Sequence, residues 1–130
     1  MMAKLALAAR ILLGLAFTVF GLNGLFEFFE APPIEGAGGE LIDAFMASGY
    51  FWTFLKLCES ACGIFLLIGR FVPLALLVLA PIVLNILLFH VFMDPAGLPI
   101  GLVTSALGIF VAYSYRGSFA GVLKGGARPS

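Results

Sequence analysis

Four long apolar stretches constrain the fold of this chain more than any other feature of its sequence. They cover about residues 5–29, 50–68, 72–93 and 98–115, and each contains few charged side chains. A helix needs roughly 20 mostly apolar residues to cross the hydrocarbon core of a bilayer. Because each stretch has about that length, the sequence predicts four membrane-spanning helices.

The composition excludes the soluble classes of protein. Of the 130 residues, 62% are hydrophobic and 11% are charged, whereas an average soluble domain has about 25% charged residues. So few charges cannot cover the surface of a soluble globule, and a disordered chain would be far less apolar. The formal net charge is zero, which leaves no excess of cations for the phosphates of a nucleic acid. We therefore expect an all-α integral membrane protein, a four-helix bundle.

The charged residues are sorted between the two ends of this predicted bundle. On one side lie the cations Lys4, Arg10, Arg70, Arg116, Lys124 and Arg128. On the other lie the acids Glu30, Glu35, Glu40, Asp43 and Asp94. Because cytoplasmic loops collect Lys and Arg, both termini are expected in the cytoplasm and the loop 30–49 outside. Residues 1–116 then form the four-span domain, and residues 117–130 form a basic cytoplasmic tail.

The outer loop has a predicted structure of its own. The Pro32–Pro33 pair is expected to stop the first helix, and the glycine-rich segment 36–39 to be flexible. Residues 40–48 then predict one or two turns of amphipathic helix, with Gly49 as the C-terminal stop. Aromatic residues on both sides of the loop, Trp52 among them, are expected to form a belt at the membrane interface.

Six polar side chains lie inside the spans, all in the outer half. They are Asn23, Glu27, Lys56, Glu59, Asn85 and His90. Polar groups in the membrane are costly and usually face a partner or a cavity, so they mark a candidate ligand-binding site. Glu59 and His90 would exchange protons with the ligand, Lys56 would tune Glu59, and the two asparagines would orient the ligand. Helical phase supports the cluster in part, because Asn23 and Glu27, four residues apart, share a helix face. Asn85 and His90, five residues apart, instead point about 140° apart.

Each of these groups also has a purely structural interpretation. Lys56 and Glu59 can pair with each other or with Glu27, which makes their burial tolerable. The two asparagines can form hydrogen bonds between helices. His90 can bond Asp94, four residues further on, at the outer end of its helix. The residues alone leave the functional and structural interpretations open.

Several motifs resemble the DoxX family of membrane proteins. Along the chain they are Ala9–Gly14 with Phe20–Gly24, Gly49-Tyr50 with Lys56, Glu59 and Gly63, Leu66–Ala75, and the run from Pro81 through Asn85 and His90 to Asp94-Pro95. The resemblance covers nearly the whole chain. It depends most on Arg10, Asn23, Glu59, Arg70, Asn85 and His90.

This resemblance implies a four-helix bundle in the bacterial inner membrane. It also implies a link to redox chemistry, since the family takes its name from a small subunit of a thiosulfate:quinone oxidoreductase. We therefore expect a small subunit of a quinone-linked membrane system, with a quinone as the candidate ligand. The alternative is a non-catalytic accessory or assembly subunit whose polar cluster is structural. Whether the protein is an enzyme, and which residues would be catalytic, stays open.

Other cofactors and partners are less favoured by the sequence. There is no metal-ligand cluster, and haem ligation by two histidines would need a second chain because His90 is the single histidine. Cys58 and Cys62, four residues apart in a span, predict packing rather than thiol chemistry. The lipid bilayer is the expected partner. Partner subunits, or a homo-oligomer formed through the small-residue faces of the first and fourth spans, stay open.

Overall fold

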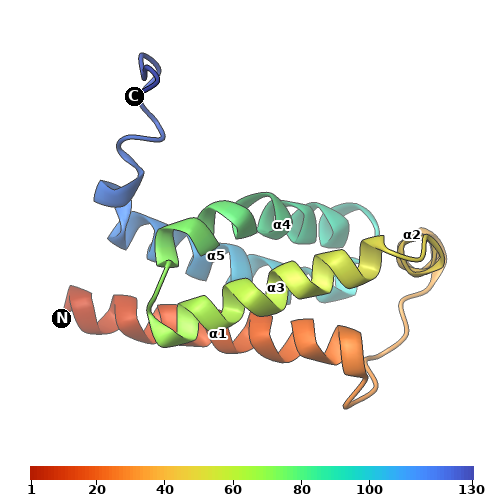
Figure 1. Cartoon of the computed structure of the whole chain (residues 1–130). Helices are drawn as coiled ribbons and strands as arrows, with labels where there is room; N and C mark the ends of the chain where they lie inside the picture. Colours follow the sequence, from red (N-terminus) through yellow and green to blue (C-terminus); the bar gives the residue numbers. More distant parts are fainter.

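The computed structural model is all helical, with four long helices arranged side by side (Figure 1). In chain order the elements are α1 Met2–Phe26, α2 Gly36–Ala47, α3 Phe51–Ile68, α4 Val72–Phe92, η1 Pro95–Gly97, α5 Leu98–Ser114 and η2 Arg116–Phe119. The stretches Met2–Phe26, Phe51–Ile68, Val72–Phe92 and Pro95–Ser114 are each long and apolar enough to cross a membrane. The predicted all-α membrane bundle is therefore confirmed.

The two ends of the bundle differ in charge. Figure 1 shows both chain termini at one end and α2, lying across the bundle axis, at the other. We call the first the basic end, because Lys4, Arg10, Arg70, Arg116, Lys124 and Arg128 all lie toward it. We call the second the acidic end, because Glu27, Glu30, Glu35, Glu40, Asp43 and Asp94 lie toward it. The cytoplasmic location of the basic end stays a prediction from the positive charges.

The end of α1 corrects the sequence-based prediction. The helix stops at Phe26, before the Pro32–Pro33 pair, because Glu27 adopts a left-handed conformation with φ of 53°. The main-chain N–H of Glu27 donates to the Asn23 carbonyl at 2.8 Å. The N–H of Phe29 donates to Asn23 Oδ1 at 2.9 Å. Asn23 thus closes the helix with both its main chain and its side chain, which satisfies groups that every helix end leaves free.

The helix in the outer loop is longer than predicted. It starts at Gly36, so the segment 36–39 is helical rather than flexible. The reason is close packing against α4: a Cβ on Gly38 would lie 3.1 Å from Phe89 Cζ and 3.2 Å from the Met93 carbonyl oxygen. Gly49, with φ of 85°, follows the last turn as the expected stop.

The closest helix packing is between α1 and α3. A Cβ on Gly63 would lie 2.5 Å from the Thr18 nitrogen, and one on Gly14 would lie 3.0 Å from the Gly63 carbonyl oxygen. Small residues allow this approach of two backbones. Fully buried side chains from all four long helices complete the core, namely Leu13, Leu66, Val72, Leu79 and Val111. The glycine face of α1, which the sequence left open for self-association, is therefore covered by α3 of the same chain.

Candidate functional site

Glu59 on α3 is the one buried charged residue, and it lies beside Lys56 of the same helix. Lys56 Nζ lies 3.0 Å from a Glu59 carboxylate oxygen, and the two side chains are 15% and 6% exposed. Of the pairings left open by the sequence, the structure has these two residues pairing with each other. Glu27 is exposed and takes no part in this pair. The charges thus compensate each other within a single turn of α3.

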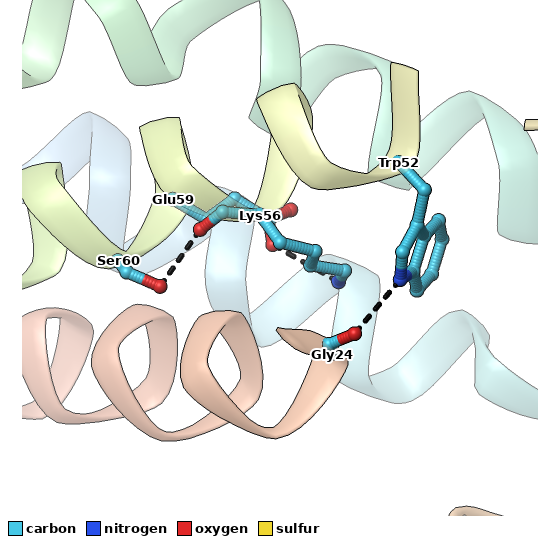
Figure 2. Close-up of polar contacts among 5 residues, drawn as sticks. All are labelled: Gly24, Trp52, Lys56, Glu59 and Ser60. Atoms are coloured by element: carbon cyan, nitrogen blue, oxygen red, sulfur yellow. Dashed lines mark hydrogen bonds and ion pairs between the residues drawn. The ribbon is translucent and has the colours of Figure 1, made fainter. Parts of the chain in front are cut away.

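Trp52 covers the ion pair from the acidic end. Lys56 Nζ lies 4.6 Å from the centroid of the Trp52 ring, a distance at which a cation is attracted to the ring face. The Trp52 indole N–H donates to the Gly24 carbonyl at 2.9 Å, and Ser60 Oγ donates to the Lys56 carbonyl at 2.7 Å (Figure 2). The hydrogen bond from Trp52 links α3 to α1, whereas the one from Ser60 lies within α3. We expected Trp52 only in an interfacial belt, although its i,i+4 spacing from Lys56 puts both residues on one helix face.

Asn23 has a local function rather than an interhelical one. Its side chain is buried, and its Oδ1 accepts the N–H of Phe29 just beyond the end of α1. Asn23 and Glu27 were expected to share a face, but Glu27 lies outside the regular helix and is exposed. The hydrogen bond therefore fixes the path of the outer loop.

His90 lies between the end of α4 and the start of α5. Its Nδ1 lies 3.2 Å from Asp94 Oδ2 and 3.2 Å from the Asp94 carbonyl oxygen, so the contact expected from the sequence is present. A Cβ on Gly101 would meet the His90 ring at 3.2 Å. The imidazole thus fills the space that Gly101 leaves, and it fastens the turn between α4 and α5.

Asn85 points away from the other candidates. It is exposed on α4, and its Nδ2 donates to the Pro81 carbonyl at 2.9 Å. It lines an open groove of about 320 Å³ together with Leu88, Phe89, Phe92 and Met93. No hydrogen bond or ion pair joins Asn85 to Glu59 or His90. The structure thus distributes the six candidates among separate local arrangements, and Asn85 is the one that faces outward.

The thiols and the metal-ligating residue types form no further centre. Cys58 and Cys62 are free, and Cys62 belongs to the apolar core. No group of three or more His, Cys, Asp or Glu side chains is placed to hold a metal ion. The polar side chains described above are therefore the candidates for a functional site in this part of the molecule.

Four long apolar helices and an ion pair enclosed between two of them define a small multi-pass membrane protein. The family model for DoxX matches residues 5–91, which include α2, α3 and nearly all of α1 and α4. Because the match covers more than half of the chain, the protein belongs to the DoxX family, as its motifs predicted. No curated protein and no solved structure matches the chain.

Proposed function

We propose that this protein is a small subunit of a quinone-linked redox system in the bacterial inner membrane, and that it binds a quinone-like ligand in the groove beside Asn85. The exposed amide of Asn85 is the observation that carries the proposal. Polar side chains in a membrane rarely face lipid without a partner. Asn85 Nδ2 has one acceptor within the chain, and Asn85 Oδ1 receives no hydrogen bond from it.

The lining of the groove suits a flat ring that carries carbonyl groups. Phe89 and Phe92 offer aromatic surface, and the second N–H of the Asn85 amide can donate to a ligand carbonyl. A volume of about 320 Å³ is at the lower end of what small-ligand sites enclose. It would hold the ring, while an isoprenoid tail would lie in the surrounding lipid.

The proposal concerns binding and assigns no chemical step. Glu59 and His90 do not line this groove, so proton exchange by these two residues stays a prediction. Electron carriers would belong to the partner subunits of such a system. The support is the DoxX family membership together with an unsatisfied amide in an aromatic groove.

The test measures the amount of quinone that binds to the full chain in lipid nanodiscs. The bound quinone is extracted and quantified by chromatography. We expect Asn85→Leu to lower the affinity about fivefold, because a hydrogen bond of this kind is worth about 1 kcal/mol. Thr104→Val is the matched control: Thr104 Oγ1 also donates to a main-chain carbonyl four residues back, at 2.8 Å, but on α5. Equal quinone binding by all three proteins would contradict the groove assignment.

The second candidate is a non-catalytic accessory subunit, and one observation favours it. Lys56, Asn23 and His90 each have a partner within the chain, so these buried groups can be purely structural. Asn85 would then meet a polar group on a helix of another subunit. In that case another subunit would cross-link to the wild-type chain in native membranes but not to the Asn85→Leu variant. Neither the wild-type chain nor the variant would bind quinone.

A further inference from the structure

Arg10 on α1 forms no ion pair with an acidic side chain of the protein. Its Nη1 donates to the Tyr115 hydroxyl at 3.2 Å, and its Nε is buried without a hydrogen-bond partner. The guanidinium packs against the end of α3, where a Cβ on Gly69 would lie 2.9 Å from Nη1. Neither ion pair of the structure includes Arg10. Since an arginine stays charged in proteins, this half-buried charge lacks a counter-ion within the chain.

The elements around Arg10 add positive charge. Arg70 follows the end of α3, Arg116 follows the end of α5, and Lys4 precedes Arg10 on α1. Arg116 stacks over Tyr113 at 4.3 Å and donates to its carbonyl at 2.9 Å. Arg116, like Arg10, forms no ion pair with a carboxylate.

Negative charge near Arg10 comes only from helix ends. The carboxyl ends of α3 and α5 each contribute about half an elementary charge at most. The acid on α3, Glu59, lies ten residues before Gly69, which is about 15 Å along a helix, and it is already paired with Lys56. The basic end therefore keeps a net positive charge that an external anion can compensate.

The position of Arg10 along the bundle indicates where this anion comes from. Its neighbours Gly69 and Tyr115 are the residues that cap α3 and α5. The 18 residues of α3 extend about 27 Å, close to the roughly 30 Å of the hydrocarbon core. The cap residues therefore mark the edge of the core, where lipid phosphates begin. The first turns of α1 continue beyond this level (Figure 1).

An open groove of about 490 Å³ lies at this level, between the start of α1 and the end of α5. It is lined by the polar residues Arg10, Ser114, Tyr115 and Arg116 and by the apolar residues Met2, Ala3, Ala6 and Leu7. The polar side offers two guanidinium groups and the Tyr115 hydroxyl as donors, a set that suits phosphate oxygens, whereas the Ser114 hydroxyl already donates to the Val111 carbonyl at 2.6 Å. The apolar side belongs to the first turns of α1, beyond the level of Arg10 (Figure 1), where it limits the access of water to the guanidinium.

We propose that this groove binds the headgroup of an anionic phospholipid. Arg10 and Arg116 would bind its phosphate, and its acyl chains would run from there into the hydrocarbon core. Basic pockets between membrane helices are known to hold anionic headgroups, and arginine binds phosphate through two parallel hydrogen bonds. A free phosphate ion would make the same polar contacts, but the groove lies at the level where lipid phosphates begin, which favours the lipid.

Native mass spectrometry of the full chain tests this, with phosphatidylglycerol and phosphatidylcholine of identical acyl chains. We expect wild-type protein to retain phosphatidylglycerol preferentially, and Arg10→Gln and Arg116→Gln each to lower that retention about fivefold, since one surface arginine contributes about that factor. Arg128→Gln is the matched control, because it removes the same charge from the tail. Arg116 is exposed, so its variant gives an answer even if Arg10→Gln does not fold.

Three results would overturn the proposal. Equal retention of the two lipids would show that no anionic headgroup is selected. An equal loss in Arg128→Gln would show a general effect of positive charge rather than a site. Displacement of the lipid by millimolar inorganic phosphate would show a free-anion site instead.

Discussion

The α1–α3 side and the α4–α5 side of this bundle are packed in different ways. Between α1 and α3, glycines bring two backbones into contact and an ion pair is enclosed. On the other side, a Cβ on Gly108 of α5 would meet nothing within 4 Å, and Asn85 of α4 is exposed. Within the most apolar windows, 28% of residues in α1 and in α3 are buried, against 22% in α4 and 11% for the α5 span. The α1–α3 pair is thus the closed part of the molecule.

This difference indicates where each kind of function is placed. On the closed side, Lys56, Glu59 and Trp52 have their partners within the chain, so they hold the helices together. The open side keeps an unsatisfied amide and small residues toward the lipid, which are the features that a ligand or another subunit needs. The comparison predicts large losses of stability for changes on the closed side and small losses on the open side.

The largest effect is expected from breaking the enclosed ion pair. Lys56→Met leaves the Glu59 carboxylate without a cation, and removing one member of a buried pair costs about 3–5 kcal/mol. The measurement is the free energy of unfolding in mixed micelles titrated with a denaturing detergent. Lys4→Met, which removes an exposed lysine from the start of α1, is the control and should have little effect.

The double variant Lys56→Met/Glu59→Leu sharpens this test. Replacing both members of a buried pair by apolar groups is often nearly neutral, so the double variant should be more stable than Lys56→Met alone. If both variants unfolded like the wild-type protein, the pair would contribute nothing to the closed side and the comparison would fail.

A smaller effect is expected from adding one methyl group at the contact between α1 and α3. In Gly63→Ala the new Cβ meets the Thr18 backbone nitrogen at 2.5 Å, and overpacking of this kind costs about 1–3 kcal/mol. Gly108→Ala makes the same change on the open side, where alanine should stabilise the helix by up to about 1 kcal/mol. Thermal unfolding followed by circular dichroism compares the two. Equal melting temperatures would show that the two sides do not differ in packing.

The sequence predicts the number and order of the spans well, because hydrophobic length is a local property. All four long helices start and end within three residues of the predicted positions. The end of α1 was missed because it depends on the hydrogen bond from Phe29 N–H to the Asn23 side chain, which apolar length does not reveal.

The candidate site was predicted less well than the fold. Depth follows from counting residues, and it placed Glu59 and Asn85 in the same half of the membrane. Which way a side chain faces depends on the rotation of each helix, and helices that are apolar all round leave that rotation undetermined. The structure accordingly encloses Glu59 and exposes Asn85. The pairing of His90 with Asp94 was predictable because the two residues are only four apart in the sequence, although Asp94 lies just beyond the end of α4.

The smallest effect is expected at this second pair, where the open side meets the acidic end. The His90 and Asp94 side chains are 15% and 22% exposed, so Asp94 is more accessible to water than the 6% exposed Glu59. Such a pair contributes at most about 1 kcal/mol, and Asp94→Asn keeps an oxygen that can accept a hydrogen bond from the His90 ring. We expect Asp94→Asn to lower the free energy of unfolding by less than Glu59→Gln does in the same micelles. If Asp94→Asn were the more damaging change, the link between α4 and α5 rather than the α1–α3 pair would hold the bundle together.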